Sequence, residues 1–291
     1  MNEIDIFSLS FLLSALRVST PLIFAAQAGL LSEKSGVVQI ALEGFMLAGA
    51  FSGAVFAHAA HSAYFGFGMA FVCGSFLSLF FSLLVVKLKT DAIVAGTGFN
   101  FLMAGLIPFI TKFIFNSTGS TPVIPIELRL SYEVTAAAVV LVFGLYFLLA
   151  KTRWGYWIQF AGEYPDGLAA CGVSVDRVRW VSVFLCGGFA AMGGASLSLF
   201  LSSSYSPMMT GGRGFIALSA LILGKWRPLP TLFGCLVFGV FDALQIRLQG
   251  VQIDGFTIPV QWIQILPYVL TIVLLAGFFG RSQAPAFLGR R

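Results

Sequence analysis

Two acidic residues, Glu43 and Asp242, stand inside long apolar runs of the sequence. Because a charge in hydrocarbon costs several kcal/mol, an ionisable residue there is a candidate for a solute or ion site. The alternative is a structural ion pair with Arg17 or Arg247, which is favoured for Asp242 near the outer end of its helix. Glu43 follows a polar corner, so capping the broken end of a neighbouring helix is an equal alternative for it.

Uncharged polar residues in the apolar runs form a second set of candidates. Asn100 lies beside Gly96 and Gly98, which leave room for a polar solute next to its amide. The alternative is a hydrogen bond between helices, worth ~0.6 kcal/mol on average in a membrane. Gln27 and Gln39 flank the first polar corner and are weaker candidates of the same kind. The candidate substrate path is Gln27, Gln39, Glu43, Asn100 and Asp242.

The residue types do not support catalysis or metal binding. His58 and His61, near the outer end of a span, are poor evidence for a metal site, and we assign none. A nucleotide-binding loop G-x-x-x-x-G-K-[ST] is missing, since Gly224-Lys225 lacks the earlier glycine and the following hydroxyl. No nucleophile–base pair or pair of carboxylates suggests an enzyme. We therefore expect no cofactor here, and any ATP-driven step requires a separate ATPase chain.

The composition is that of a multi-pass membrane protein. Of the 291 residues, 58% are hydrophobic and 10% are charged, whereas soluble domains carry about 25% charged residues. Several apolar runs exceed the ~20 residues that cross a bilayer as a helix. The net charge of +5 comes from basic residues beside these runs, so it reports topology and not nucleic-acid binding. We expect an all-α fold with about nine (eight to ten) transmembrane helices in one transmembrane domain, residues 1–291.

One apolar run is too short to cross the bilayer as a helix. The predicted spans lie at about residues 7–31, 37–60, 64–86, 92–115, 134–150, 181–204, 215–223, 229–246 and 258–279. Even over residues 214–224 the seventh measures only ~16 Å, about half the hydrocarbon core. It either crosses together with part of the preceding loop or re-enters the same side. The positive-inside rule favours the crossing, with the N-terminus outside and the C-terminus inside.

A weak internal similarity links this short run to the first polar corner. The segment Ile40-Ala-Leu-Glu-Gly-Phe-Met-Leu47 resembles Ile216-Ala-Leu-Ser-Ala-Leu-Ile-Leu223, and each follows a glycine-bearing corner. On the predicted topology the two segments run in opposite directions through the membrane. Such an inverted repeat with broken helices is typical of transporters that bind their solute near the membrane midplane.

The longest polar break, residues 161–179, reads as a short surface helix within a cytoplasmic loop, 151–180. Pro165 suits the first helical position, Asp166 favours the N-terminal end of the helix dipole, and Gly172 suits the stop. The residues between them are mostly small, so this helix can dock closely into a groove on another protein. An ordinary connecting loop is the alternative. Basic residues flank the break and place it in the cytoplasm, namely Lys151, Arg153, Arg177 and Arg179.

The break contains E-x-P-x-x-L-A-A-x-G-V-x-V-x-R-V-R, which resembles the coupling loop of ABC importer permeases for branched-chain amino acids, ribose and nucleosides. Three further segments resemble the nucleoside and simple-sugar branch of that family: LLSEKSGVVQIALEGFMLAGA, GRGFIALSALILGKW and FGVFDALQIRLQ. The resemblance implies a type II-like importer fold. It also implies that an ATPase is contacted by Glu163, Pro165, Asp166, Gly167, Leu168, Ala169, Ala170 and Gly172.

The resemblance further implies the partners and the place of the protein. We expect an ABC ATPase subunit, a second and longer related permease in a heterodimer, and an extracytoplasmic solute-binding protein. The binding protein would dock near residues 116–129 and 203–213. The location would be the bacterial cytoplasmic (inner) membrane. The solute would be a purine or pyrimidine nucleoside, a free base or a simple sugar, and a neutral one, since buried charge is scarce.

A different class of transporter fits the residues in another way. An ion-coupled secondary transporter would work alone and would use Glu43 or Asp242 as its proton or sodium site. Such a carrier has no need of a coupling loop. The two hypotheses therefore differ in whether the helix near residue 165 is required for transport.

Overall fold

The computed structural model describes residues 9–116, 119–125, 129–248, 252–253, 256–257, 265, 269, 272 and 283–290. In this part of the chain the fold is helical, apart from a pair of two-residue strands. Seven of the described helices are long and apolar enough to cross a membrane, and α9 is a shorter apolar helix. The predicted span 258–279 lies outside the described residues, except for three single positions.

The helices follow the predicted spans closely. Their bounds are α1 Leu9–Lys34, α2 Leu42–Ala60, α3 Ala63–Ser82 with the π-helical turn Leu83–Lys87, α4 Ala92–Phe115, α5 Glu133–Lys151, α6 Arg153–Glu163, α7 Pro165–Ala170, α8 Val175–Ser196 with the π-helical turn Leu197–Leu201, α9 Arg213–Leu223 and α10 Pro228–Leu248. The strands β1 Gln252–Ile253 and β2 Phe256–Thr257 pair antiparallel. The sixth predicted span was placed too late, because its helix begins at Val175 and includes Arg177 and Arg179.

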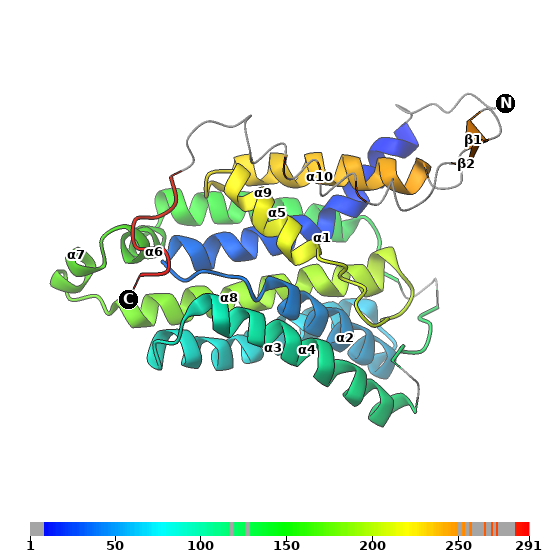
Figure 1. Ribbon diagram of the computed structural model, residues 1–291, viewed down its shortest axis with the longest axis horizontal. Helices are drawn as coiled ribbons and strands as arrows, with labels where there is room; N and C mark the ends of the chain where they lie inside the picture. Colours follow the sequence, from blue (N-terminus) through cyan, green and yellow to red (C-terminus); the bar gives the residue numbers. More distant parts are fainter. Residues whose placement is uncertain are drawn as a thin grey trace.

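Helix α8 forms the centre of the bundle. In the most apolar 18-residue stretch of α8, 78% of the residues are buried. The corresponding share is 22% for α4, which lies at the periphery. Figure 1 shows α1 and α8 running along the long axis of the molecule. The end that carries α7 and residues 283–290 is called the coupling end here, and the end where α1 begins is called the distal end. The buried helices are surrounded by others whose outward faces are apolar, as expected of a protein dissolved in lipid.

Glycines allow α8 to approach its neighbours closely. A side chain at Gly194 would collide with the backbone of Met46 in α2, and one at Gly49 would collide with the backbone of Ala191. A side chain at Gly187 would meet the backbone of Gly74 in α3. Without a hydrophobic force between helices in lipid, such close packing supplies much of the attraction between them. The glycines of α8 thus allow close contact with both α2 and α3.

Two non-helical segments interrupt the bundle in opposite directions. Residues 35–41 leave the end of α1 at the coupling end and lead into α2. Residues 202–212 leave the end of α8 at the distal end and lead into α9. The opposite directions are those of the predicted inverted repeat.

The short helix α9 completes a crossing and does not re-enter. Its far end lies at the coupling end, where the indole Nε1 of Trp226 donates to Oε2 of Glu33 at 2.6 Å. The segment before it lies at the distal end, where the backbone N–H of Ile124 donates to the carbonyl of Ser203 at 2.8 Å. Residues 202–223 therefore traverse the bundle from the distal end to the coupling end, and α10 returns.

We expect Gly194→Val to lower the free energy of unfolding by about 1–3 kcal/mol, because the new side chain has no space against α2. Thermal unfolding of the purified protein in detergent measures the loss. The control is Gly105→Val in α4, where an added Cβ has no heavy atom within 4 Å. An equal fall in Tm for both variants would contradict close α2–α8 packing as the cause.

Candidate functional site

Glu43 caps the interrupted helix α9. Its Oε1 accepts the backbone N–H of Gly212 at 2.8 Å, and its Oε2 accepts that of Gly214 at 2.7 Å. The first N–H groups of a helix have no partner within it, and a negative charge there is favoured by the helix dipole. Gly211 and Gly212 have φ of 53° and 82°, which lets the backbone turn its N–H groups toward the carboxylate. The capping alternative for Glu43 is therefore the one the structure shows.

Asn100 does the same for the interrupted helix α2. Its Oδ1 accepts the N–H of Gly44 at 2.8 Å, and its Nδ2 donates to the carbonyl of Ile40 at 3.0 Å. Gly96, one turn earlier in α4, lets that helix lie directly on Ile40, whereas a side chain at Gly98 would meet nothing within 4 Å. The expected room beside Asn100 is thus occupied by backbone on the Gly96 side. Each interrupted helix is capped by a side chain from another helix.

The partner of Asp242 is Arg213, the first residue of α9. The two side chains are 3.5 Å apart and are largely buried. The prediction of an ion pair was right, but both proposed partners were wrong. Arg17 donates to the carbonyl of Phe200 and lies over its ring. Arg247 donates to the hydroxyl of Ser10 at 2.8 Å.

Gln27 in α1 and Gln39 in the non-helical segment 35–41 are completely buried. Nε2 of Gln27 donates to the carbonyl of Pro228 at 2.9 Å, which ties α1 to the start of α10. Nε2 of Gln39 lies 3.2 Å from the sulfur of Cys186 in α8. Both amide oxygens lack a partner among the described residues. Of the predicted path residues, the structure gathers four around the two helix breaks: Gln39, Glu43, Asn100 and, through Arg213, Asp242. Gln27 binds the start of α10 instead.

Sequence reasoning missed Glu33 and Arg213. Glu33 lies in the first polar corner of the sequence, but only 3% of it is exposed, and Trp226 donates to its carboxylate. Arg213 was placed in an outer loop, yet it begins α9 inside the bundle. Their position in the sequence could have pointed to them. Glu33 precedes the segment 40–47, and Arg213 precedes the similar segment 216–223.

Helix α7 is the short surface helix that the sequence predicted. Tyr164 precedes it, Pro165 occupies its first turn, and Gly172 with φ +78° follows its end. Leu168 is its one buried residue. Its exposed side chains include Asp166, Ala169 and Ala170.

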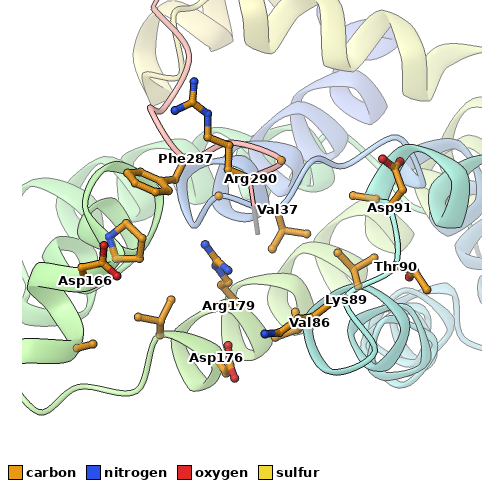
Figure 2. Close-up of a pocket in the computed structure, with 17 residues that line it drawn as sticks. Val37, Val86, Lys89, Thr90, Asp91, Asp166, Asp176, Arg179, Phe287 and Arg290 are labelled. Atoms are coloured by element: carbon orange, nitrogen blue, oxygen red, sulfur yellow. The ribbon is translucent and has the colours of Figure 1, made fainter.

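A cavity of about 350 Å³ lies beside α7 at the coupling end. Figure 2 shows Asp166 on one side of it and Asp91, from the turn between α3 and α4, on the other. Arg179 of α8 points into the space between them, and Phe287 and Arg290 of the C-terminal residues lie above it. The coupling end thus presents both a small-residue helix and a charged hollow.

Comparison with known proteins identifies the family. A family model described as branched-chain amino acid transport system / permease component matches residues 11–275. The chain belongs to this permease family. It is 33% identical to the nucleoside ABC transporter permease protein NupC of Lactococcus lactis, over 92% of this chain and 91% of that protein.

Two other relatives are similar to this permease. The guanosine ABC transporter permease protein NupQ of Bacillus subtilis is 32% identical over 92% of this chain and 91% of that protein. The nucleoside ABC transporter permease protein NupB of Lactococcus lactis is 24% identical over 75% of this chain and 64% of that protein. The family resemblance inferred from the sequence motifs is confirmed.

We expect Glu43→Ala to destabilise the permease by about 3 kcal/mol, since it removes two hydrogen bonds to a charged acceptor. Hydrogen exchange at the start of α9 should accelerate, and Tm should fall. The Tm of Glu43→Gln should lie between those of the wild type and Glu43→Ala, because an amide keeps one accepting oxygen. The control, Glu133→Ala, removes an acid that binds only the exposed Tyr64 hydroxyl among the contacts described for it. Unchanged exchange at the start of α9 in Glu43→Ala would contradict the capping role.

Proposed function

We propose that this permease is the membrane subunit of an ATP-driven importer for nucleosides or a related neutral, sugar-bearing solute. The observation that carries the proposal is the similarity to NupC and NupQ over more than nine-tenths of each chain. The sequence has no nucleotide-binding loop of its own. The energy would come from a separate ATPase subunit that grips α7 at the coupling end, which would face the cytoplasm of a bacterium.

Two acidic residues, Glu43 and Asp242, are bound within the protein and are not free to pair with a charged solute, which supports a neutral one. Both oxygens of Glu43 accept backbone N–H groups, and Asp242 is paired with Arg213. These carboxylates therefore serve the fold, and an ion-coupled carrier has no support from the comparisons. Asn100 is likewise bound to backbone groups of Gly44 and Ile40. The unpartnered amide oxygens of Gln27 and Gln39 stay as candidates for polar contacts along the path.

Two segments at the distal end offer a single surface for a binding protein. The N–H of Thr121 donates to the carbonyl of Tyr205 at 3.1 Å, and the N–H of Tyr205 returns a bond to the Thr121 hydroxyl at 2.9 Å. The connection between α4 and α5 is thereby joined to the segment that leads into α9. A binding protein docked there would act directly on the chain entering α9.

A second permease completes the proposed transporter. NupC and NupB come from the same organism, and this chain matches both of them. The match spans only 64% of NupB, which supports a partner longer than this chain. We propose a heterodimer with the solute path between the two permeases.

The decisive experiment is uptake into proteoliposomes that contain both permeases and the ATPase, with the binding protein added outside. Labelled guanosine, uridine and glucose should be compared with ATP inside the vesicles. We expect nucleoside uptake that requires ATP. Uptake that needs a proton or sodium gradient and no ATPase would overturn the proposal.

We expect Ala170→Trp to reduce uptake and ATPase binding by about tenfold or more, because a large side chain blocks close docking of a small-residue helix. Ala170 is exposed, so the fold should survive. Gly167 is a poorer test, since a side chain there would collide with the Tyr164 ring within the permease itself. Ala59→Trp, an exposed position at the distal end of α2, is the control. Normal ATPase binding by Ala170→Trp would exclude α7 as the docking helix.

Cys171 provides a built-in probe of orientation, because it is exposed whereas Cys186 and Cys235 are buried and Cys73 is partly covered. A membrane-impermeant maleimide should label it in inside-out vesicles and not in intact cells whose outer envelope admits the reagent. Cys171→Ser should abolish the labelling. Labelling in intact cells would place α7 outside and contradict ATPase docking.

A further inference from the structure

The elbow between α6 and α7, residues 161–164, lies directly on the corner that follows α1, residues 34–36. A side chain at Gly162 would collide with the carbonyl of Lys34. One at Gly36 would lie 3.4 Å from both the carbonyl oxygen of Ala161 and the Cα of Gly162. Gly36 also has φ +94°, a conformation that other residues rarely adopt. No side chain therefore separates the elbow of α7 from the beginning of the unwound segment 35–41.

Arg179 joins the same two pieces of backbone. Its Nε donates to the carbonyl of Ser35 at 3.2 Å, and its Nη2 lies 3.4 Å from the carbonyl of Ala161. The guanidinium is a planar, rigid fork of donors, so one arginine can hold two carbonyls at a fixed separation. It projects from the first turns of α8, the helix at the centre of the bundle.

The C-terminal residues add a second connection. The N–H of Phe287 donates to the carbonyl of Gly162 at 2.9 Å, and the N–H of Gly289 donates to the carbonyl of Gly36 at 3.0 Å. The N–H of Ala286 donates to Oε2 of Glu163 at 3.2 Å. Leu288 packs on the apolar cluster beneath them. A short strap, residues 285–290, thus bridges the elbow and the corner from outside the bundle.

Helix α7 itself borders a cavity, which Pro165, Asp166 and Ala169 line together with Gly36 and Val37. The cavity of about 350 Å³ separates Asp166 from Lys89 and Asp91 in the turn before α4 (Figure 2). A displacement of α7 that moves residues 161–163 at the end of α6 therefore acts directly on the corner at 34–36. The α3–α4 turn lies across the cavity from α7. The segment after the corner contains Ile40, whose carbonyl Asn100 binds. It then enters α2, where Glu43 caps α9.

We propose that Arg179 and the strap 285–290 form a staple that transmits movement of α7 to both interrupted helices. The inference rests on the proposed ATP-driven function, in which an ATPase moves α7. Arg179 is a positioning residue here, because it acts through the corner and not on the solute. The staple links ATP hydrolysis to solute movement, and its loss uncouples them.

The test uses the complete transporter in proteoliposomes, with uptake and ATP hydrolysis measured together. A chain ending at Gln283 loses the strap, and the matched control, a chain ending at Gly289, keeps the N–H donors of Ala286, Phe287 and Gly289. Arg179→Ala removes the bridge within the bundle, and the exposed neighbour Arg177→Ala is its control. Retention of the ATPase subunit during purification is the third measurement.

We expect the chain ending at Gln283 and Arg179→Ala to lose about tenfold in uptake, a typical size for coupling between sites. Basal hydrolysis and ATPase retention should match the wild type, so that more ATP is consumed per solute. Arg179→Lys should recover part of the uptake, since an ammonium can bind one of the two carbonyls. Both controls should transport normally.

Three outcomes would overturn the staple. Normal uptake by the chain ending at Gln283 would show that the strap transmits nothing. Loss of the ATPase subunit from that chain would make the strap a docking surface and not a transmission element. A wild-type complex without ATP-driven uptake would contradict the proposed function and the staple with it. Removal of the strap takes away no described helix residue. The uptake of the chain ending at Gln283 therefore tests the staple even where Arg179→Ala fails to fold.

Discussion

The structure depends on satisfying the backbone groups that are released where a helix breaks inside a membrane. Hydrocarbon offers no hydrogen bonds, so an interrupted helix is tolerated only where protein groups replace the missing partners. Asn100 supplies them for α2 and Glu43 supplies them for α9. Glu43 stands in the first turn of α2, so the helix that Asn100 secures is the one that secures α9. The cap of α9 therefore depends on the cap of α2.

The transmembrane helices could be predicted because hydropathy and the absence of solvent leave few alternatives. The bounds of α4 match the apolar run, and Pro165 and Gly172 marked α7 well. The start of α8 was missed for a physical reason. Arg177 and Arg179 look like the end of a loop in sequence, but Arg179 is helical because nearby carbonyls satisfy its guanidinium.

The partners of the polar side chains could not be predicted, because they depend on how deep a non-helical segment descends. Residues 202–212 carry Arg213 into the bundle, where it meets Asp242. From the sequence alone Arg213 belongs to an outer loop, and Arg17 and Arg247 are the expected partners of Asp242. Glu33 was misjudged in the same way, since its corner is covered by the turn that carries Trp226. The contacts of these polar side chains therefore come from the fold and could not be predicted from the sequence.

The long separation between Glu43 and its partner has a consequence for biosynthesis. Gly212 follows Glu43 by 169 positions in the chain. At about 5–20 residues per second on the ribosome, roughly ten to thirty seconds pass before that partner exists. During this interval the nascent Glu43 carboxylate has no end of α9 to bind. The cap that joins the two halves of the bundle can therefore form only after the start of α9 has been synthesised.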